Sequence, residues 1–287
     1  MAGQEELFPS REFVRGQPRT FKPLTRPLWT ERKAALIARY LYYFVLITKH
    51  GTYIDAFAGR QNDRAKEGWA VECVLRNEPA WLRRYHLFEQ APGSAAELRS
   101  LAAEFSDRKI TIVEGDSNTE LPRALPAGSI RDRQAAFCLL DQRTFECHWA
   151  TCSHVAGIKP AGYRIEQFYF LAQGWLDRAL AAIRTEDGLA AVRSWWGGDD
   201  WEQFRELPSR DRAASVAERF RSELGYQEAT PWPIHERGGT GRVMYYMIHA
   251  SDHSEAPALM RRAYEWAVAP VPEEVDQLEI EFLGVEL

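Results

Sequence analysis

Residues 51–59, Gly-Thr-Tyr-Ile-Asp-Ala-Phe-Ala-Gly, are the stretch that decides the fold of this chain. They predict a short apolar strand that ends in a carboxylate, Asp55, followed by a tight turn at two small residues, Ala58 and Gly59. In open parallel α/β sheets, ligands bind at the carboxyl ends of the strands, where the first turn lets the backbone approach them closely. The stretch therefore predicts the first strand of such a sheet, with a ligand-binding edge at Asp55.

Further strands and helices alternate along the chain after this stretch. Apolar runs predict strands over 84–89, 110–113, 136–140 and 167–171, and apolar residues at helical spacing predict helices near 30–41, 70–76 and 93–105, the first capped by Thr30. A helical segment over 175–224, a β-hairpin over 234–249 and a helix over 256–266 follow. This alternation predicts an α/β fold: a doubly wound, mostly parallel, Rossmann-like sheet with a helical insertion or cap.

The same pattern predicts how the chain is divided. We expect an irregular basic arm over residues 1–28 and a Rossmann-like core over 29–174. A helical insertion or cap over 175–225 then precedes the closing hairpin and helix of the core over 226–270, and an acidic tail occupies 271–287.

Composition limits the class of protein. The 287 residues are 45% hydrophobic and carry a formal net charge of -5, which argues against coating nucleic acid by bulk charge. The four cysteines are too few and too irregularly placed for a disulfide scaffold. The charged N-terminus does not resemble a signal peptide, and the most apolar run, 40–48, is about half the length of a membrane span. We expect a cytoplasmic protein.

Acidic residues follow the first four predicted strands, and parallel strands bring such positions to one edge of the sheet. The turn after Asp55 is typical of the pocket for S-adenosylmethionine, with Asp55, Phe57 and Gly59 next to the cofactor. Asp55 would direct the methionine ammonium, Glu89 would accept hydrogen bonds from the ribose hydroxyls, and Asp116 would face the adenine amino group. One feature departs from this pattern, because residues 59–62 read Gly-Arg-Gln-Asn and lack a second glycine.

Asp141 follows the fourth strand, where enzymes that methylate exocyclic amines place an acidic or amide residue followed by prolines and an aromatic residue. Here Asp141 is followed by Gln-Arg-Thr-Phe, so the prolines are missing and Phe145 supplies the aromatic ring. We expect Asp141 to orient the methyl acceptor and Phe145 to stack on it. These two are the candidate catalytic residues.

A cluster of cysteine and histidine after Asp141 resembles a metal site only superficially. Cys147, His148, Cys152 and His154 fall within about eight residues, whereas zinc ligands usually form two separated pairs. We predict no metal site. Nothing in the sequence indicates a lowered pKa for Cys147, so a nucleophilic role is not expected either.

From Trp29 to Trp266 the chain resembles the three-Cys-motif partner (TcmP) family of bacterial proteins. The matching segments, in order, are 29–33 (Trp-Thr-Glu-Arg-Lys), 53–59, 68–70, 140–149, 174–178 and 245–251. Two departures fall on the expected binding site: Gln61 replaces a family glycine, and residues 142–144 replace a Pro-aromatic-Gly segment. Family members carry a small residue where this chain has Trp69. The resemblance implies a class I methyltransferase-type Rossmann core and a three-cysteine, radical-enzyme-like partner protein.

Three functional hypotheses remain open. The first is an S-adenosylmethionine-dependent methyltransferase-like enzyme whose acceptor, nucleic acid or small molecule, is unknown. The second is a non-catalytic partner subunit with a degenerate cofactor pocket. The third is a different reaction on the same scaffold, in which Arg60 and Arg143 bind an anionic substrate, because arginine suits bidentate capture of phosphate or carboxylate.

Overall fold

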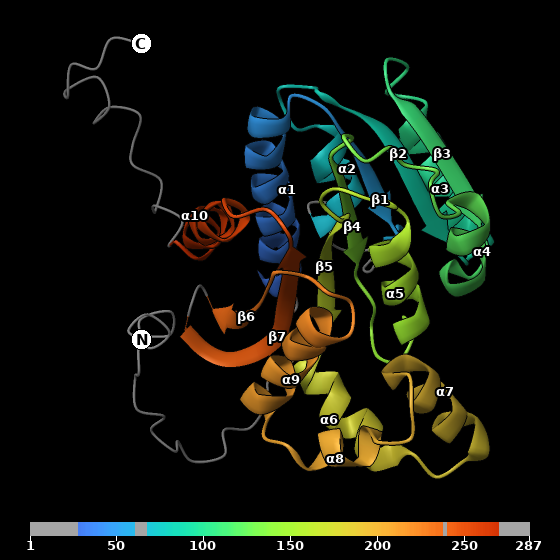
Figure 1. Ribbon diagram of the computed structural model, residues 1–287, viewed down its shortest axis with the longest axis vertical. Helices are drawn as coiled ribbons and strands as arrows, with labels where there is room; N and C mark the ends of the chain where they lie inside the picture. Colours follow the sequence, from blue (N-terminus) through green and yellow to red (C-terminus); the bar gives the residue numbers. More distant parts are fainter. Residues whose placement is uncertain (1–27, 61–67, 238–239, 270–287) are drawn as a thin grey trace, which may run out of the picture.

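A seven-stranded sheet forms the centre of the molecule, with the strand order β3-β2-β1-β4-β5-β7-β6. The computed structural model describes residues 28–60, 68–237 and 240–269, shown as coloured ribbon in Figure 1. The strands are β1 (Gly51–Asp55), β2 (Leu82–Glu89), β3 (Lys109–Glu114), β4 (Ala136–Leu140), β5 (Glu166–Leu171), β6 (Glu228–Arg237) and β7 (Thr240–Ser251). β1 to β5 run parallel, and β7 is antiparallel to both β5 and β6.

Helices connect the parallel strands and cover both faces of the sheet. They are α1 (Leu28–Thr48), α2 (Ala70–Leu75), α3 (Pro92–Ala102), α4 (Ser117–Ala124), α5 (Trp149–Gly157), α6 (Gln173–Ala182), α7 (Glu186–Trp196), α8 (Trp201–Glu206), α9 (Ser209–Ser222) and α10 (Ala256–Val268). In the described part of the chain no helix is both long and apolar enough to cross a membrane.

The sheet separates two hydrophobic cores. On one face, apolar residues of α1, α2, α3 and α10 pack against the sheet, among them Tyr40, Val71 and Met260. On the other face, residues of α4, α5, α7 and α9 do the same, among them Leu121, Val155 and Phe220. β1 and β4 lie between the two layers, and every residue of each is buried. This burial explains why both strands read as continuous apolar runs.

The predicted doubly wound α/β fold is confirmed, and the five parallel strands lie within about two residues of their expected positions. The hairpin is longer than predicted, because β6 begins at Glu228 and not at residue 234. The predicted cap at Thr30 is wrong, because α1 already begins at Leu28. α4 was missed: Pro122 lies inside it, and the sequence gives little periodicity over eight residues. The predicted arm over 1–28, apart from its last residue, and the predicted tail over 271–287 lie outside the described residues.

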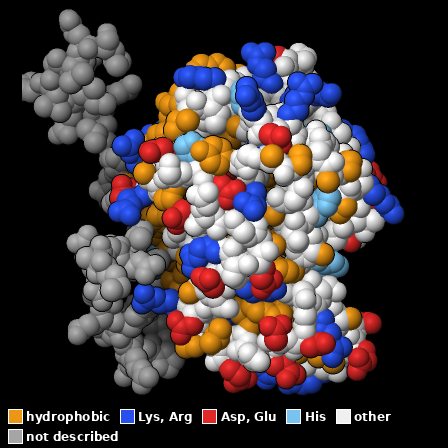
Figure 2. Space-filling model, in the orientation of Figure 1, with side chains coloured by type: hydrophobic (Ala, Val, Ile, Leu, Met, Phe, Trp, Pro, Cys, Tyr) orange, Lys and Arg blue, Asp and Glu red, His pale blue; other side chains and the backbone are white. Residues whose placement is uncertain are grey.

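The helices from α6 to α9 gather at the lower end of the molecule in Figure 1, where the parallel strands finish. Trp195, Trp196, Trp201 and Phe204 are all buried there, and the Trp196 and Phe204 ring centroids are 4.6 Å apart. The tryptophans therefore form core and not an open ligand cage. Acidic side chains gather at this end of the face shown in Figure 2, and exposed acidic residues of this segment include Glu186, Asp187, Asp199, Glu202 and Glu206.

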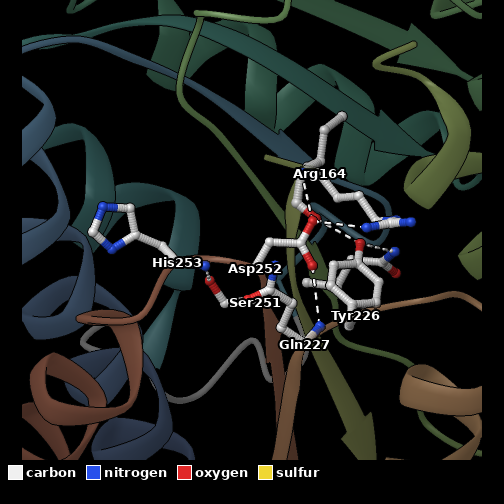
Figure 3. A network of polar contacts seen from close by, with 8 residues as sticks. Arg164, Tyr226, Gln227, Ser251, Asp252 and His253 are labelled. Atoms are coloured by element: carbon white, nitrogen blue, oxygen red, sulfur yellow. Dashed lines mark hydrogen bonds and ion pairs between the residues drawn. The ribbon is translucent and has the colours of Figure 1, made fainter. Parts of the chain in front are cut away.

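A polar network at the opposite end of the sheet joins the closing hairpin to β5 (Figure 3). The buried carboxylate of Asp252 accepts hydrogen bonds from the backbone nitrogen of Arg164 at 3.0 Å, from its Nη1 at 2.9 Å and from the backbone nitrogen of Gln227 at 3.1 Å. Beside it, the Tyr226 hydroxyl donates to the carbonyl of Ile165 at 2.6 Å. The Asp252 carboxylate, directly after β7, thus accepts hydrogen bonds from residues that lie just before β5 and β6.

Candidate cofactor and acceptor site

The strand order reverses between β1 and β4, and this reversal determines where a ligand binds. From β1 the chain continues outward to β2 and β3, and it then returns to the other side of β1 with β4 and β5. At such a reversal the two crossover connections leave in opposite directions and open a crevice beyond the carboxyl ends of the strands. Asp55 ends β1 and Asp141 directly follows β4, so both predicted site residues lie at the reversal.

Asp55 is buried at the floor of this site, with an exposed fraction of 1%. Its Oδ2 accepts a hydrogen bond from the Tyr53 hydroxyl at 2.8 Å, and its Oδ1 accepts one from the backbone nitrogen of Phe57 at 3.1 Å. Burial raises the pKa of the Asp55 carboxyl to about 7, and these two hydrogen bonds oppose the rise. Asp55 therefore exchanges a proton near neutral pH.

Asp141 forms a buried ion pair with Lys33 of α1. The Lys33 Nζ lies 2.6 Å from Oδ2 of Asp141, and their side chains are only 4% and 6% exposed. The same ammonium lies 4.2 Å from the ring centroid of Phe170, a distance at which the ring face attracts a cation. Removing either partner would leave an uncompensated buried charge, which costs roughly 3–5 kcal/mol.

Gly59 and Glu89 meet at the turn after β1. A Cβ atom on Gly59 would lie 2.0 Å from Oε2 of Glu89 and 2.7 Å from its Cδ, so only glycine allows this approach. The other oxygen of Glu89, Oε1, accepts a hydrogen bond from the backbone nitrogen of Ala91 at 2.7 Å. The turn is also tied to β2, because the Ala58 nitrogen donates to the Phe88 carbonyl at 2.9 Å. The predicted glycine and carboxylate are thus neighbours in space.

Asp116 is the N-cap of α4. Its Oδ1 accepts hydrogen bonds from the backbone nitrogen of Asn118 at 3.0 Å and from its side-chain Nδ2 at 2.9 Å. Gly115 precedes it with a φ of +144°, and its nitrogen donates to the Glu89 carbonyl at 3.0 Å. This bond holds the turn after β3 against the end of β2, so Asp116 and Glu89 belong to the same edge of the sheet.

Trp69 packs against the turn after β1. Its Nε1 donates to the Ala58 carbonyl at 2.8 Å, and the Arg60 guanidinium lies 4.7 Å from the centroid of a Trp69 ring. Arg60 and Trp69 also line a surface groove of about 720 Å³ between α2 and α3, together with Glu72, Cys73, Arg76, Glu97, Ser100, Leu101 and Glu104. Arg60, predicted to bind substrate, therefore faces this groove.

The two predicted residues of the loop after β4 lie apart from the Asp55 floor. Phe145 packs into the core, with its ring centroid 5.2 Å from that of Trp195. Arg143 is exposed, and its backbone nitrogen donates to Oε2 of Glu146 at 2.8 Å. Gln142 is buried, and its Oε1 accepts a hydrogen bond from the Cys147 nitrogen at 3.0 Å. The loop presents Asp141 to the site and turns Phe145 towards the cap helices.

The cysteine and histidine cluster forms core packing. Sγ of Cys147 lies 3.8 Å from Sγ of Cys152, and both side chains are fully buried. Nε2 of His154 lies 2.9 Å from the Leu125 carbonyl oxygen. A hydrogen bond with Cys152, and then burial, raise the pKa of the Cys147 thiol well above its ordinary value. Within residues 28–60, 68–237 and 240–269, no three His, Cys, Asp or Glu side chains are arranged to hold a metal ion.

The donor set carries both signs of charge, as the polar end of S-adenosylmethionine does. Lys33, Asp55, Gly59, Trp69 and Asp141 all line one small cavity. Its volume, about 10 Å³, is roughly the room that one water molecule needs. The space left by the missing side chain of Gly59 is occupied by the carboxylate of Glu89, the last residue of the neighbouring strand.

Two members of this site, Lys33 and Tyr53, were not predicted as site residues. The sequence did contain a signal that Lys33 is buried and paired, because it lies on the apolar face of the predicted first helix with Leu36, Ile37 and Tyr40. A charged residue on such a face is buried only when it is paired. The sequence contains no signal for which carboxylate it meets, since Asp141 lies 108 residues away along the chain.

Comparison with known proteins identifies no family for this chain. No family model matches this chain, and no curated protein sequence matches it. Similar solved structures include an O-methyltransferase from Bacillus cereus in complex with SAH (TM-score 0.43, 11% identity, 79% of this chain and 92% of that chain). TYW2 of M. jannaschii in complex with AdoMet is another (TM-score 0.39, 11% identity, 80% and 77%). A third is precorrin-6y C5,15-methyltransferase from Geobacter metallireducens (TM-score 0.37, 14% identity, 73% and 86%). Likeness at this level concerns the fold and does not identify a substrate.

Proposed function

We propose that this protein binds S-adenosylmethionine at the carboxyl ends of β1 and β2 and acts as a methyltransferase. The observation that carries the proposal is the contact between Gly59 and Glu89 at the reversal of strand order. A glycine with no room for a side chain, beside a carboxylate at the end of the next strand, suits a ribose that donates two hydroxyl hydrogen bonds. Membership of the three-Cys-motif partner family is the finer part of this proposal.

The residues of the chain would act mainly by positioning. Glu89 would hold the ribose, and Asp116 would face the adenine ring from the neighbouring turn. Asp55 and Asp141 would surround the methionine end and the entering acceptor. S-adenosylmethionine supplies an electrophilic methyl group on a sulfonium. Transfer of this group needs an aligned acceptor and little else, so a rigid, buried set of polar groups is a suitable site.

Calorimetric titration with S-adenosylmethionine and S-adenosylhomocysteine tests the proposal. We expect a dissociation constant on the order of micromolar, weakened at least about tenfold in Glu89→Ala. Glu114→Ala is the matched control, because Glu114 pairs with Glu89 in register across β2 and β3 but forms an ion pair with Arg99 on α3. Wild-type protein that binds neither ligand at millimolar concentration would overturn the proposal.

The second candidate, a non-catalytic partner subunit, is favoured by two features of the turn after β1. Trp69 fills space beside the cavity at a position where the resembling family has a small residue, and Arg60 stacks on it. This candidate would be supported if the protein copurified with a three-cysteine partner and bound neither S-adenosylmethionine nor S-adenosylhomocysteine. The third, an anionic substrate held by Arg60 and Arg143, predicts phosphate or carboxylate binding that is lost in Arg60→Met.

A further inference from the structure

The negative net charge of the chain is distributed unevenly over the surface. Acidic side chains gather at the cap helices, whereas Lys and Arg side chains gather at the opposite end of the face shown in Figure 2. The amino ends of the parallel strands form that end, so it lies away from Asp55 and Glu89, which end β1 and β2. A local basic surface attracts a polyanion even on a chain whose formal net charge is -5.

Two cations lie side by side where β2 and β3 begin. Arg84 and Lys109 are opposite each other in the register of these parallel strands, and both side chains are exposed. Burial, and then the charges of Lys109 and Arg84, lower the pKa of His86, the next residue of β2 on the same face. Because the two like charges repel each other, an anion bound between them would be favourable.

The turn before β4 adds two exposed arginines, Arg131 and Arg133, next to this pair. The turn is fixed by Gln134, whose backbone nitrogen donates to the Arg131 carbonyl at 2.9 Å. The Gln134 side chain also donates a hydrogen bond to the hydroxyl of Thr52, and Thr52 is opposite Arg84 in the register of β1 and β2. Four exposed cations therefore follow one another along the amino ends of the strands, from β3 to β4.

An exposed aromatic ring continues this row at β5. The segment before β5 packs against the turn before β4, because Oδ1 of Asp132 accepts a hydrogen bond from the Ala161 nitrogen at 3.0 Å. A Cβ atom on Gly162 would lie only 3.2 Å from the Asp132 carbonyl oxygen. Tyr163 follows directly and is 56% exposed, with its ring centroid 5.2 Å from that of His253. Much of the Tyr163 ring is thus open to solvent beside the cations.

The amino-edge strip is the name used below for five residues: Arg84, Lys109, Arg131, Arg133 and Tyr163. Within residues 28–60, 68–237 and 240–269, the ion pairs at this end of the sheet join Arg108 to Asp107 and Arg164 to Asp252. Neither pair includes a cation of the amino-edge strip. Its charges are therefore available to a partner of opposite charge.

We propose that the amino-edge strip binds single-stranded nucleic acid, with phosphates on its four cations and an unpaired base stacked on Tyr163. Three of the cations are arginines, whose planar guanidinium matches the geometry of a phosphate. The strip crosses five neighbouring strands and is roughly 19 Å long at about 4.8 Å between strands, which is room for several nucleotides. An acidic peptide would neutralise the cations but has no base to stack on the ring.

This proposal goes beyond the proposed function, because the strip lies at the other end of the sheet from the candidate cofactor site. Its test does not require S-adenosylmethionine. Failure of either proposal is therefore visible separately from failure of the other.

Fluorescence anisotropy of the full chain with a labelled oligothymidylate of about 15 nucleotides tests the proposal. We expect a dissociation constant on the order of micromolar at low salt. The logarithm of the affinity should fall with the logarithm of the salt concentration with a slope of roughly -3, because each of four phosphate contacts contributes about 0.7. Wild-type protein that does not bind at low salt would overturn the proposal.

Two variants separate the charges of the strip from its ring. The double variant Arg131→Ala/Arg133→Ala should bind at least about tenfold more weakly, with a salt slope flatter by roughly 1.4. Tyr163→Ala should bind at least about fivefold more weakly with an unchanged salt slope, whereas Tyr163→Phe keeps the ring and should bind like the wild type. All three positions are exposed, so the Tm of each variant should equal that of the wild type.

Arg261→Ala/Arg262→Ala is the matched control, because it removes the same charge from two exposed positions of α10. It should keep the wild-type affinity and salt slope. Equal weakening in the two double variants would overturn the proposal, since it would show attraction by overall charge only. Polyglutamate that displaces the oligonucleotide as effectively as unlabelled oligothymidylate would also overturn it, in favour of an acidic protein partner.

Discussion

The carboxylate of Glu89 occupies the space beside Gly59 in which any other residue would place its Cβ atom. The Oε2 atom would lie 2.0 Å from that Cβ, well inside van der Waals contact. Two residues thirty positions apart in the sequence thus define one wall of the candidate site, and neither can change without affecting the other.

Gly59→Ala should displace Glu89 and weaken cofactor binding at least about tenfold, because the new methyl group and the carboxylate cannot share the space. The free energy of unfolding should change little, because the atoms in the way are the end of a flexible, half-buried side chain that can move aside. Calorimetry and urea denaturation measure the two effects. Gly93→Ala is the control, since a Cβ there meets nothing within 4 Å. Normal binding by Gly59→Ala would contradict the assigned geometry.

Asp55 should make the stability of the protein fall as the pH rises from about 4 to 7. Its pKa is raised from 3.8 to about 7 in the folded protein, so across this range the native state holds a proton that the unfolded chain releases. The free energy of unfolding then decreases with pH, by up to roughly 4 kcal/mol in total. Urea denaturation at several pH values measures this slope, which should flatten in Asp55→Asn. Asp107→Asn, on an exposed loop, should keep it.

The same carboxyl group should link ligand binding to proton release. An ammonium beside Asp55 favours its ionised form, so binding below pH 7 should expel a proton. Titrations in buffers of different ionisation enthalpy would show the proton release, and affinity should drop as the pH falls below 7. An affinity that does not change between pH 6 and 8 would argue against contact between Asp55 and the ligand ammonium.

Asp252→Ala should destabilise the fold without affecting the ligand site. The change leaves three nitrogen donors without their acceptor, two from Arg164 and one from Gln227, at a cost of about 2–4 kcal/mol. In thermal denaturation the Tm of Asp252→Ala should be lower than that of Asp252→Asn. The Tm of the control, Glu255→Ala, should be near that of the wild type. Because this network lies at the amino end of β5, cofactor affinity should stay within about threefold of the wild-type value. A larger loss of cofactor affinity would show that the two ends of the sheet are coupled.

Three of the four thiols should resist labelling in the native protein. Cys138, Cys147 and Cys152 are fully buried, which denies a reagent access to them. The environments of Cys138 and Cys147 also disfavour the thiolate, since the pKa of each is raised well above its ordinary value. Cys73 is partly accessible, and burial raises its pKa as well, so it should react slowly. Mass spectrometry after treatment with iodoacetamide would locate the modified residues. Rapid modification of Cys147 would reopen a nucleophilic role.

The sequence by itself determined the parallel sheet and the acidic residues along its edge. Continuous apolar runs such as 136–140 are recognisable in the sequence because β1 and β4 are buried on both faces. The acidic residue at the end of a strand, Asp55 in β1 and Glu89 in β2, is also directly visible in the sequence. Such signals are local, so they survive without knowledge of the rest of the chain. Asp116 was assigned to the edge correctly, but its role as a helix cap was hidden because Pro122 obscures α4.

Only the tertiary structure decided which of these residues share a cavity. Lys33 reaches Asp141 because α1 packs across the sheet, and Phe145 turns towards Trp195 because the cap helices cover that side of the loop. The raised pKa of Asp55 likewise follows from its complete burial, which no nearby residue in the sequence indicates. Long-range pairs and desolvation depend on how whole elements pack, and this information is not contained in local spacing.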